Sequence, residues 1–259
     1  MNAGRFLLAA ALVALPARAA LAQTDPAPAP APAPAPSPAG SRFYVGVSAG
    51  AQAKASTYTD SYEVPLYLET QTVSTVYPEV SGLFIAFDAR YKIWKQLTVG
   101  VGVLSFMDDG DAAVTARLPH PFFDNTFRTI EGTVNTKREE MAVYPTVGWI
   151  VPFSSSVQLA LSAGPSFVTV KQQFVTNVNF TEAYPFDTAS FTSADVTQSS
   201  ASATGVYVGA DVSWMFSRHV GAGGIVQFSR ATVKQKVGDR TVSIDAGGAQ
   251  AGGGIRFVF

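Results

Sequence analysis

The sequence has no cysteine and only two histidines. Without cysteine, the chain cannot form a disulfide, a thiolate zinc site, a thiol nucleophile or a cysteine-linked lipid anchor. Charged residues make up only 14% of the chain, and the formal net charge is -1. Proteins that bind nucleic acid usually carry a clustered excess of Lys and Arg, so nucleic acid is not an expected partner.

A long hydrophobic run is also missing. The apolar stretch at residues 6–15 is too short for a membrane-spanning helix, which needs about 20 residues. Yet 47% of the residues are hydrophobic, and the mean hydropathy is +0.18. The hydrophobic residues must therefore be distributed over many short segments.

Residues 1–22 have the pattern of a cleaved secretory signal peptide. Arg5 precedes the apolar segment 6–15, and Ala20 and Ala22 form the small-x-small pattern of a cleavage site. An uncleaved anchor helix is the alternative.

Residues 23–40 are rich in Pro and Ala and include the sequence PAPAPAPAPAPSP at 26–38. Proline fixes φ and lacks an N–H group, which excludes regular helix and strand. We therefore expect a disordered, extended periplasmic segment that acts as a linker. A tether that contacts the cell wall is the alternative.

From residue 41 onward, hydrophobicity alternates with period two. The segments 80–93, 96–106, 157–167 and 205–216 each place apolar side chains on one face and mostly polar or small ones on the other. This pattern predicts β-strands.

The predicted strands are joined alternately by short and long connections. The short ones lie at 94–96, 153–156 and 217–219, and the long polar ones at 56–79, 108–139, 171–203 and 235–246. Three short turns give six strands, and segments 43–54 and 247–259 complete eight. Alternating tight turns and long loops are typical of an up-and-down transmembrane β-barrel, which we expect at residues 41–259.

Aromatic residues support a membrane location. Trp94, Trp149 and Trp214 each lie at or just before a predicted short turn. Such rings prefer the headgroup level of a bilayer, so these residues predict an aromatic girdle at one end of the barrel. The apolar strand faces would then point to lipid, and both termini would be periplasmic.

The last residues, AGGGIRFVF, resemble the C-terminal signal of bacterial outer-membrane barrels. Ile255, Phe257 and Phe259 are its alternating apolar positions. Residues 41–259 resemble the small eight-stranded outer-membrane β-barrel family, which includes the OmpA transmembrane domain, OmpX, OmpW and opacity-type porin-like proteins. The resemblance implies a bacterial outer-membrane location and recognition of the last strand by the barrel-insertion machinery.

Five charged residues fall on the predicted lumen face: Asp88, Arg90, Lys92, Asp211 and Arg256. Buried charges must pair, and an eight-stranded barrel leaves little interior space. We expect an ion-pair network that plugs the barrel. A gate or a charged constriction in a pore is the alternative.

The sequence offers little for catalysis or metal binding. Hydrolysis of lipid would need a His beside a Ser, with a carboxylate to orient it, and neither His120 nor His219 has such neighbours at a strand's outer end. We expect no enzyme and no cofactor. Asp108, Asp109 and Asp111 lack EF-hand spacing, and a solvated loop is favoured over a weak divalent-cation site.

The expected function is therefore structural or surface-interacting, with four long extracellular loops on a monomeric, plugged barrel. The alternative is a narrow passive channel for small solutes, and a lipid-modifying enzyme is a distant third. Expected partners are outer-membrane lipid, lipopolysaccharide and an external ligand at the loops. Basic residues expected near the outer rim, where anionic headgroups attract them, are Arg128, Lys137, Arg138, Lys171, Arg230, Lys234, Lys236 and Arg240.

Overall fold

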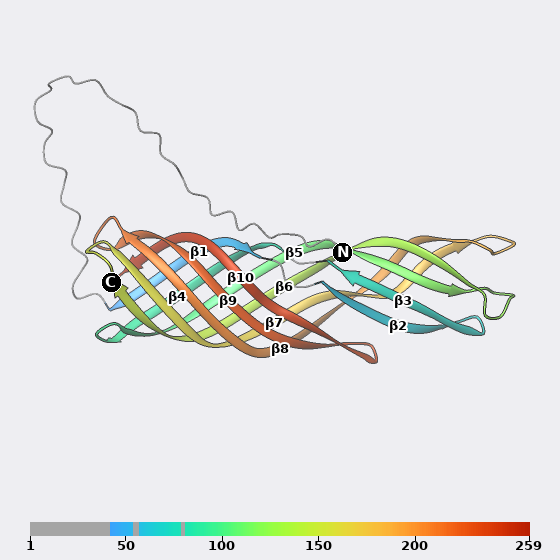
Figure 1. The fold of residues 1–259 in the computed structure, drawn as a ribbon, viewed down its shortest axis with the longest axis horizontal. Helices are drawn as coiled ribbons and strands as arrows, with labels where there is room; N and C mark the ends of the chain where they lie inside the picture. The colour runs from blue at the N-terminus through green and yellow to red at the C-terminus, as the bar shows by residue number, and fades with distance from the viewer. Residues whose placement is uncertain (1–41, 54–56, 79–80) are drawn as a thin grey trace, which may run out of the picture. The chain divides into compact units, whose positions relative to one another are not determined.

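The structure, a computed structural model, describes residues 42–53, 57–78 and 81–259. The predicted signal peptide, 1–22, and the Pro/Ala segment, 23–40, lie outside these residues. The described residues form ten strands (Figure 1). Among them, no helix is long and apolar enough to cross a membrane. The strands are β1 (Phe43–Gln52), β2 (Tyr58–Leu66), β3 (Glu69–Tyr77), β4 (Leu83–Trp94), β5 (Leu97–Pro119), β6 (Phe127–Pro152), β7 (Val157–Glu182), β8 (Ala189–Met215), β9 (Val220–Val237) and β10 (Arg240–Val258).

Eight of these strands form a closed antiparallel ring, as the sequence predicts. The ring runs β1-β4-β5-β6-β7-β8-β9-β10, and β10 pairs with β1 to close it. The closure is in register from Gln52, opposite Gln250, to Tyr44, opposite Val258. Phe43 and Phe259 extend the closure by exchanging backbone hydrogen bonds of 2.9 and 3.1 Å. The last strand thus leaves no open edge in the ring.

The outward face of the ring is apolar over a limited height. On β6 the outward side chains are apolar from Met141 to Trp149, a length close to the roughly 9–11 residues of a transmembrane strand. Past this band the outward positions become polar. On β6, Glu139 is the next outward residue after Met141. The same change occurs from Met107 to Asp109 on β5 and from Phe228 to Arg230 on β9. We call this band the apolar belt.

The prediction that the long polar connections are loops is corrected by the structure. Strands β5 to β8 continue far beyond the apolar belt, and residues 58–77 form a hairpin, β2–β3, that joins the same sheet by pairing with β5. These segments are rich in Thr, Ser and Val, which suit strands. On β8 polar residues stand on both faces and hide the strand pattern, whereas β5 alternates the buried Val114 and Leu118 with exposed Thr115 and Arg117. We call residues 58–77, 108–140 and 169–204 the head.

The head has an apolar core of its own. Between the β2-β3-β5-β6 sheet and the β7–β8 hairpin lie buried side chains that are separate from the lumen cluster: Val73, Val114, Ala116, Leu118, Ile130, Val175 and Val178. Buried apolar side chains that contact one another form a hydrophobic core. The head is therefore a folded unit and not a group of solvated loops.

Candidate functional site

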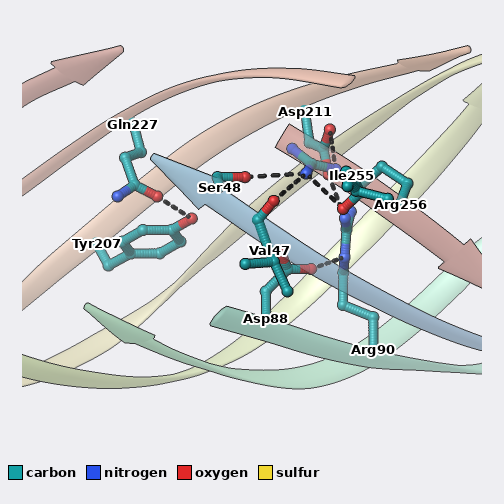
Figure 2. A network of polar contacts seen from close by, with 9 residues as sticks. All are labelled: Val47, Ser48, Asp88, Arg90, Tyr207, Asp211, Gln227, Ile255 and Arg256. Carbon is teal, nitrogen blue, oxygen red and sulfur yellow. Dashed lines mark hydrogen bonds and ion pairs between the residues drawn. The ribbon is translucent and has the colours of Figure 1, made fainter. Parts of the chain in front are cut away.

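Four of the five charged residues predicted in the lumen lie close together at mid-height of the belt. Asp88 and Arg90 come from β4, Asp211 from β8 and Arg256 from β10 (Figure 2). Arg90 Nε lies 3.0 Å from Asp88 Oδ2, and Arg256 Nε lies 3.0 Å from Asp211 Oδ2. A further ion pair joins Arg90 Nη2 to Asp211 Oδ2. Two carboxylates and two guanidinium groups therefore form one neutral chain across the barrel.

A glycine on the neighbouring strand makes room for this chain of charges. Gly46 on β1 lies opposite both Asp88 and Arg256 in the strand register. A Cβ at Gly46 would stand 2.2 Å from Asp88 Oδ1, which is closer than nonbonded atoms approach. Ser48, two residues further on the same face, accepts a 2.9 Å hydrogen bond from Arg256 Nη1. The small residues of β1 thus provide the volume that the charged side chains occupy.

A layer of aromatic and amide side chains fills the lumen next to the network. Tyr144 and Tyr207 stack with ring centroids 4.1 Å apart. Tyr207 donates to Gln227 at 3.2 Å, Gln227 to Gln250 at 2.6 Å, and Gln250 to Gln52 at 2.5 Å. This chain of hydrogen bonds crosses from β8 to β1.

The space left beside these groups is small. A cavity of about 30 Å³ is lined by members of the charge network together with Tyr144 and Tyr207. A water needs about 10–15 Å³ of such volume, so the cavity holds very few waters.

The other predicted residues take different places. Lys92 makes no side-chain hydrogen bond or ion pair with any residue that the structure describes. It lies beside a register shift at the turn end of β4, so the structure does not bring it into the network. Trp94, Trp149 and Trp214 are exposed on the outer surface at the turn end. At the same end, Ile255 and Phe259 are exposed and Phe257 is half-buried.

Comparison with known proteins gives fold likenesses only. No family model matches the chain, and no curated protein matches it.

The chain is similar in structure to small outer-membrane β-barrel proteins. Neisserial surface protein A is 15% identical, with 84% of this chain and 97% of that chain covered and a TM-score of 0.45. OprG from Pseudomonas aeruginosa is 9% identical, with 87% and 97% covered and a TM-score of 0.48. Ail, the attachment invasion locus protein of Yersinia pestis, is 14% identical, with 84% and 97% covered and a TM-score of 0.36. The fold described above rests on this chain's own strands and pairings.

The basic residues predicted near the outer rim divide into two groups. Lys137, Lys171, Arg230, Lys234 and Lys236 do face outward. Arg128, Arg138 and Arg240 instead point into the head, where they pair with Glu182, Glu140 and Asp60 respectively. Their parity could have revealed this, because Arg138 and Glu140 share a face with the inward Ala142 and Tyr144.

The acidic group at the start of the head does not converge on one point. Asp109 and Asp111 face outward on β5, and Asp108 lies on the opposite face. Asp111 accepts a hydrogen bond from Asn135 at 3.2 Å. Among the described residues, no group of three or more His, Asp or Glu side chains is placed to hold a metal ion.

His120 closes the β5–β6 turn and does not offer a catalytic base. Its Nδ1 accepts hydrogen bonds from the backbone N–H groups of Phe122 and Phe123, at 3.1 and 3.2 Å. Its side chain is 1% exposed, and Nε2 lies 3.9 Å from Asp187. A general base needs a free ring nitrogen that a substrate can reach. The lone pair of Nδ1 is used here, so His120 serves the structure of the turn.

The far tip of the head is held together by Arg128 and Glu182. Arg128 is buried and donates to Glu182 at 2.5 Å, to the carbonyl of Phe186 at 2.9 Å and to the carbonyl of Pro119 at 2.9 Å. Tyr67, in the β2–β3 turn, also donates to Glu182. These contacts join three turns that are far apart in the sequence.

We expect acid to loosen this tip. Partial burial alone would raise the pKa of Glu182, but hydrogen bonds from Tyr67 and Arg128 and the charge of Arg128 lower it below its ordinary value of 4.5. A lowered folded-state pKa gives stability that is complete above the ordinary value and is lost as the pH falls through the lowered one. The Tyr67 contact should thus persist from neutral pH to about 4.5 and weaken below it.

The backbone amide shifts of Tyr67 and Leu68, followed by NMR through a pH titration, would measure this loss. Glu182→Gln is the control, because it keeps an acceptor for Tyr67 but removes the charge. All other ionisable groups of the tip are the same in both proteins. An identical acid transition in the wild type and Glu182→Gln would contradict the assignment to Glu182.

Proposed function

We propose that this chain is a bacterial outer-membrane protein whose barrel anchors a folded extracellular head that binds an external partner. The observation that carries the proposal is the continuity of β5 to β8, which run from the apolar belt into the head without a break in pairing between β5 and β6 or between β7 and β8 apart from local bulges. A binding surface on a rigid scaffold keeps its geometry better than one on mobile loops.

The filled lumen supports this role over a passive channel. The ion-pair chain, the stacked tyrosines and the glutamine chain occupy the interior within the belt. Buried charges paired with good geometry are costly to separate. A narrow solute channel is the second candidate. The small cavity beside Asp88 and Asp211 is the observation that favours it.

We infer the orientation of the barrel from the features of its two ends. The aromatic girdle and the short turns lie at the end that carries the C-terminus, and we assign this end to the periplasm (Figure 1). Outer-membrane lipid and lipopolysaccharide would surround the apolar belt. The barrel-insertion machinery would recognise the strand that contains Ile255, Phe257 and Phe259, and the protein would act as a monomer.

A variant without the head tests this function. Three cuts at directly opposed strand pairs would replace the segments between Tyr58 and Tyr77, between Ala112 and Val134, and between Phe174 and Thr197 by two-residue Asn-Gly turns. The barrel below the cuts keeps its register. Folding is checked by the shift in gel mobility on heating and by circular dichroism.

Cells that display each protein would be tested for adhesion to surfaces coated with polypeptide, polysaccharide or phospholipid. We expect the complete protein to give at least about tenfold more adhesion than the trimmed one on one of these coatings. A tenfold difference in affinity corresponds to about 1.4 kcal/mol of binding free energy. Equal adhesion of folded wild type and folded trimmed protein on all three coatings would contradict a binding role for the head.

A further inference from the structure

The tip of the head exposes a cluster of aromatic and aliphatic side chains. The cluster comes from three turns that lie together at the end of the chain's barrel opposite the C-terminus (Figure 1). Tyr184 is 84% exposed and Phe122 is 69% exposed. Monomeric proteins usually keep such side chains apart, so a group of them marks an interaction site. We call this cluster the aromatic crown: Tyr67, Leu68, Phe122, Phe123, Tyr184 and Phe186.

The crown is held in place from beneath. Phe122 meets the edge of Phe186 at a centroid distance of 5.5 Å, and Phe186 meets Tyr184 at 6.0 Å. The buried Arg128 binds the carbonyl of Phe186, and the backbone N–H groups of Phe122 and Phe123 bind His120. A surface whose rings are fixed before binding loses little conformational freedom when a partner arrives.

A hydrogen bond between two of the turns adds to this rigidity. The backbone N–H of Asn125, in the β5–β6 turn, donates to Glu69 Oε1 of the β2–β3 hairpin at 3.1 Å. Together with the Tyr67–Glu182 contact, this bond connects the β2–β3 hairpin to both other turns. The crown therefore behaves as one surface and not as three independent turns.

The exposed charges within the three turns are acidic, and the exposed Arg117 lies just before them, near the end of β5. Asp187 is 71% exposed, Asp124 is exposed, and Glu69 and Glu182 are partly exposed. Arg128, at the start of β6, is buried, and so is His120 in the β5–β6 turn, with side chains 5% and 1% exposed. Ionised carboxylates only accept hydrogen bonds. A ligand that fits here must bring donors, and preferably positive ones.

We propose that the aromatic crown binds a basic segment of an external polypeptide that carries Lys or Arg together with apolar residues. The proposal rests on the surface-binding role and names its partner. Guanidinium groups stack on aromatic faces, and aromatic residues with Arg are the usual centres of protein interfaces. The head already uses this contact internally, because Arg117 lies 3.7 Å from the ring centre of Phe127 and Arg240 lies 4.0 Å from that of Tyr62.

The same observations argue against two other ligands. An anionic membrane surface would be repelled by the exposed carboxylates, since like charges across an interface are unfavourable. A neutral sugar can donate hydroxyl hydrogen bonds to the carboxylates, but it carries no positive charge to pair with theirs. The basic polypeptide is the partner for which both the rings and the carboxylates are complementary.

The complete protein in nanodiscs of zwitterionic lipid provides the test, because detergent would cover the crown. The probe is a fluorescein-labelled synthetic peptide of alternating Arg and Val, and the comparison peptide has Glu in place of Arg. We expect fluorescence anisotropy to show at least tenfold tighter binding of the Arg peptide. A neutral oligosaccharide and vesicles of anionic lipid serve as the alternative probes.

Phe122 and Tyr184 are largely exposed, so we expect their replacement to leave the fold intact, which gel mobility with and without heating checks. The double variant Phe122→Ser with Tyr184→Ser should weaken binding of the Arg peptide at least tenfold. Asp124→Asn with Asp187→Asn should weaken it and reduce its dependence on salt, because those charges attract the peptide over a distance. Val196→Ala, on the exposed part of β8 away from the crown, is the matched control and should bind like the wild type.

Equal binding of the Arg and Glu peptides, or binding unaffected by the Phe122/Tyr184 double variant, would overturn the proposal. Binding of the oligosaccharide or the vesicles in place of the Arg peptide would overturn it too, but would leave the surface-binding role intact. The role itself fails only if the trimmed and complete proteins adhere equally in the cell assay, so the two failures can be told apart.

Discussion

Asp211→Asn should lower the free energy of unfolding of the barrel by about 3–5 kcal/mol, the usual effect of removing one partner from a buried ion pair. Asp211 lies between two guanidinium groups, Arg90 and Arg256, and its side chain is 11% exposed. Without its charge, two buried cations share only Asp88. Equilibrium unfolding in urea of the protein in lipid vesicles would measure the change.

Two controls make this result specific. Asp245→Asn removes an acid that pairs at 3.0 Å with Arg230 on the outer surface, where the side chains are 38% and 65% exposed. An exposed pair contributes about 0–1 kcal/mol, so this variant should unfold nearly as the wild type does. Adding Arg256→Gln to Asp211→Asn should cost less than the sum of the single changes, because the unpaired cation is then gone.

A loss at Asp211 no larger than the loss at Asp245 would contradict the network. It would mean that water reaches the charges and replaces their partners. An additive double variant would likewise mean that Asp211 and Arg256 do not depend on each other.

The ring of eight strands could be predicted from the sequence because the barrel obeys a simple pattern. Along β4 and β6, one face meets lipid and the other meets a narrow lumen, so hydrophobicity alternates over the length of the belt. The short turns at 94–96, 153–156 and 217–219 then fix the strand count. The order of strands follows because neighbours in the sequence pair.

The β8 part of the head could not be predicted in the same way, because both faces of that strand carry Thr and Ser. Ser193, Thr197 and Ser200 of β8 are exposed or nearly so, and the strand borders water on most sides. What identifies it as a strand is its pairing with β7 as far as Ala189, opposite Glu182. Such pairing between distant segments leaves no mark in hydrophobic periodicity.

The lumen network could be predicted from the parity of its residues along the strands, and Lys92 is the one predicted member that lies outside it. Asp88, Arg90, Asp211 and Arg256 share the parity of the inward face, and charges there must find each other. Lys92 has the same parity, but it lies at the turn end of β4, next to the register shift. The crown gave no signal, since its aromatic residues lie in three separate turns whose meeting depends on Arg128 and Glu182.

The central claim is that the barrel is filled and the head is the working part. Planar-bilayer conductance of the refolded protein, with wild type beside Asp211→Asn, tests this claim most directly. Folding of each sample is confirmed first by its gel mobility with and without heating. The account predicts no discrete conductance steps from folded wild type. Reproducible steps whose size shifts when Asp211 is neutralised would contradict it, because they would show that ions pass the charge network.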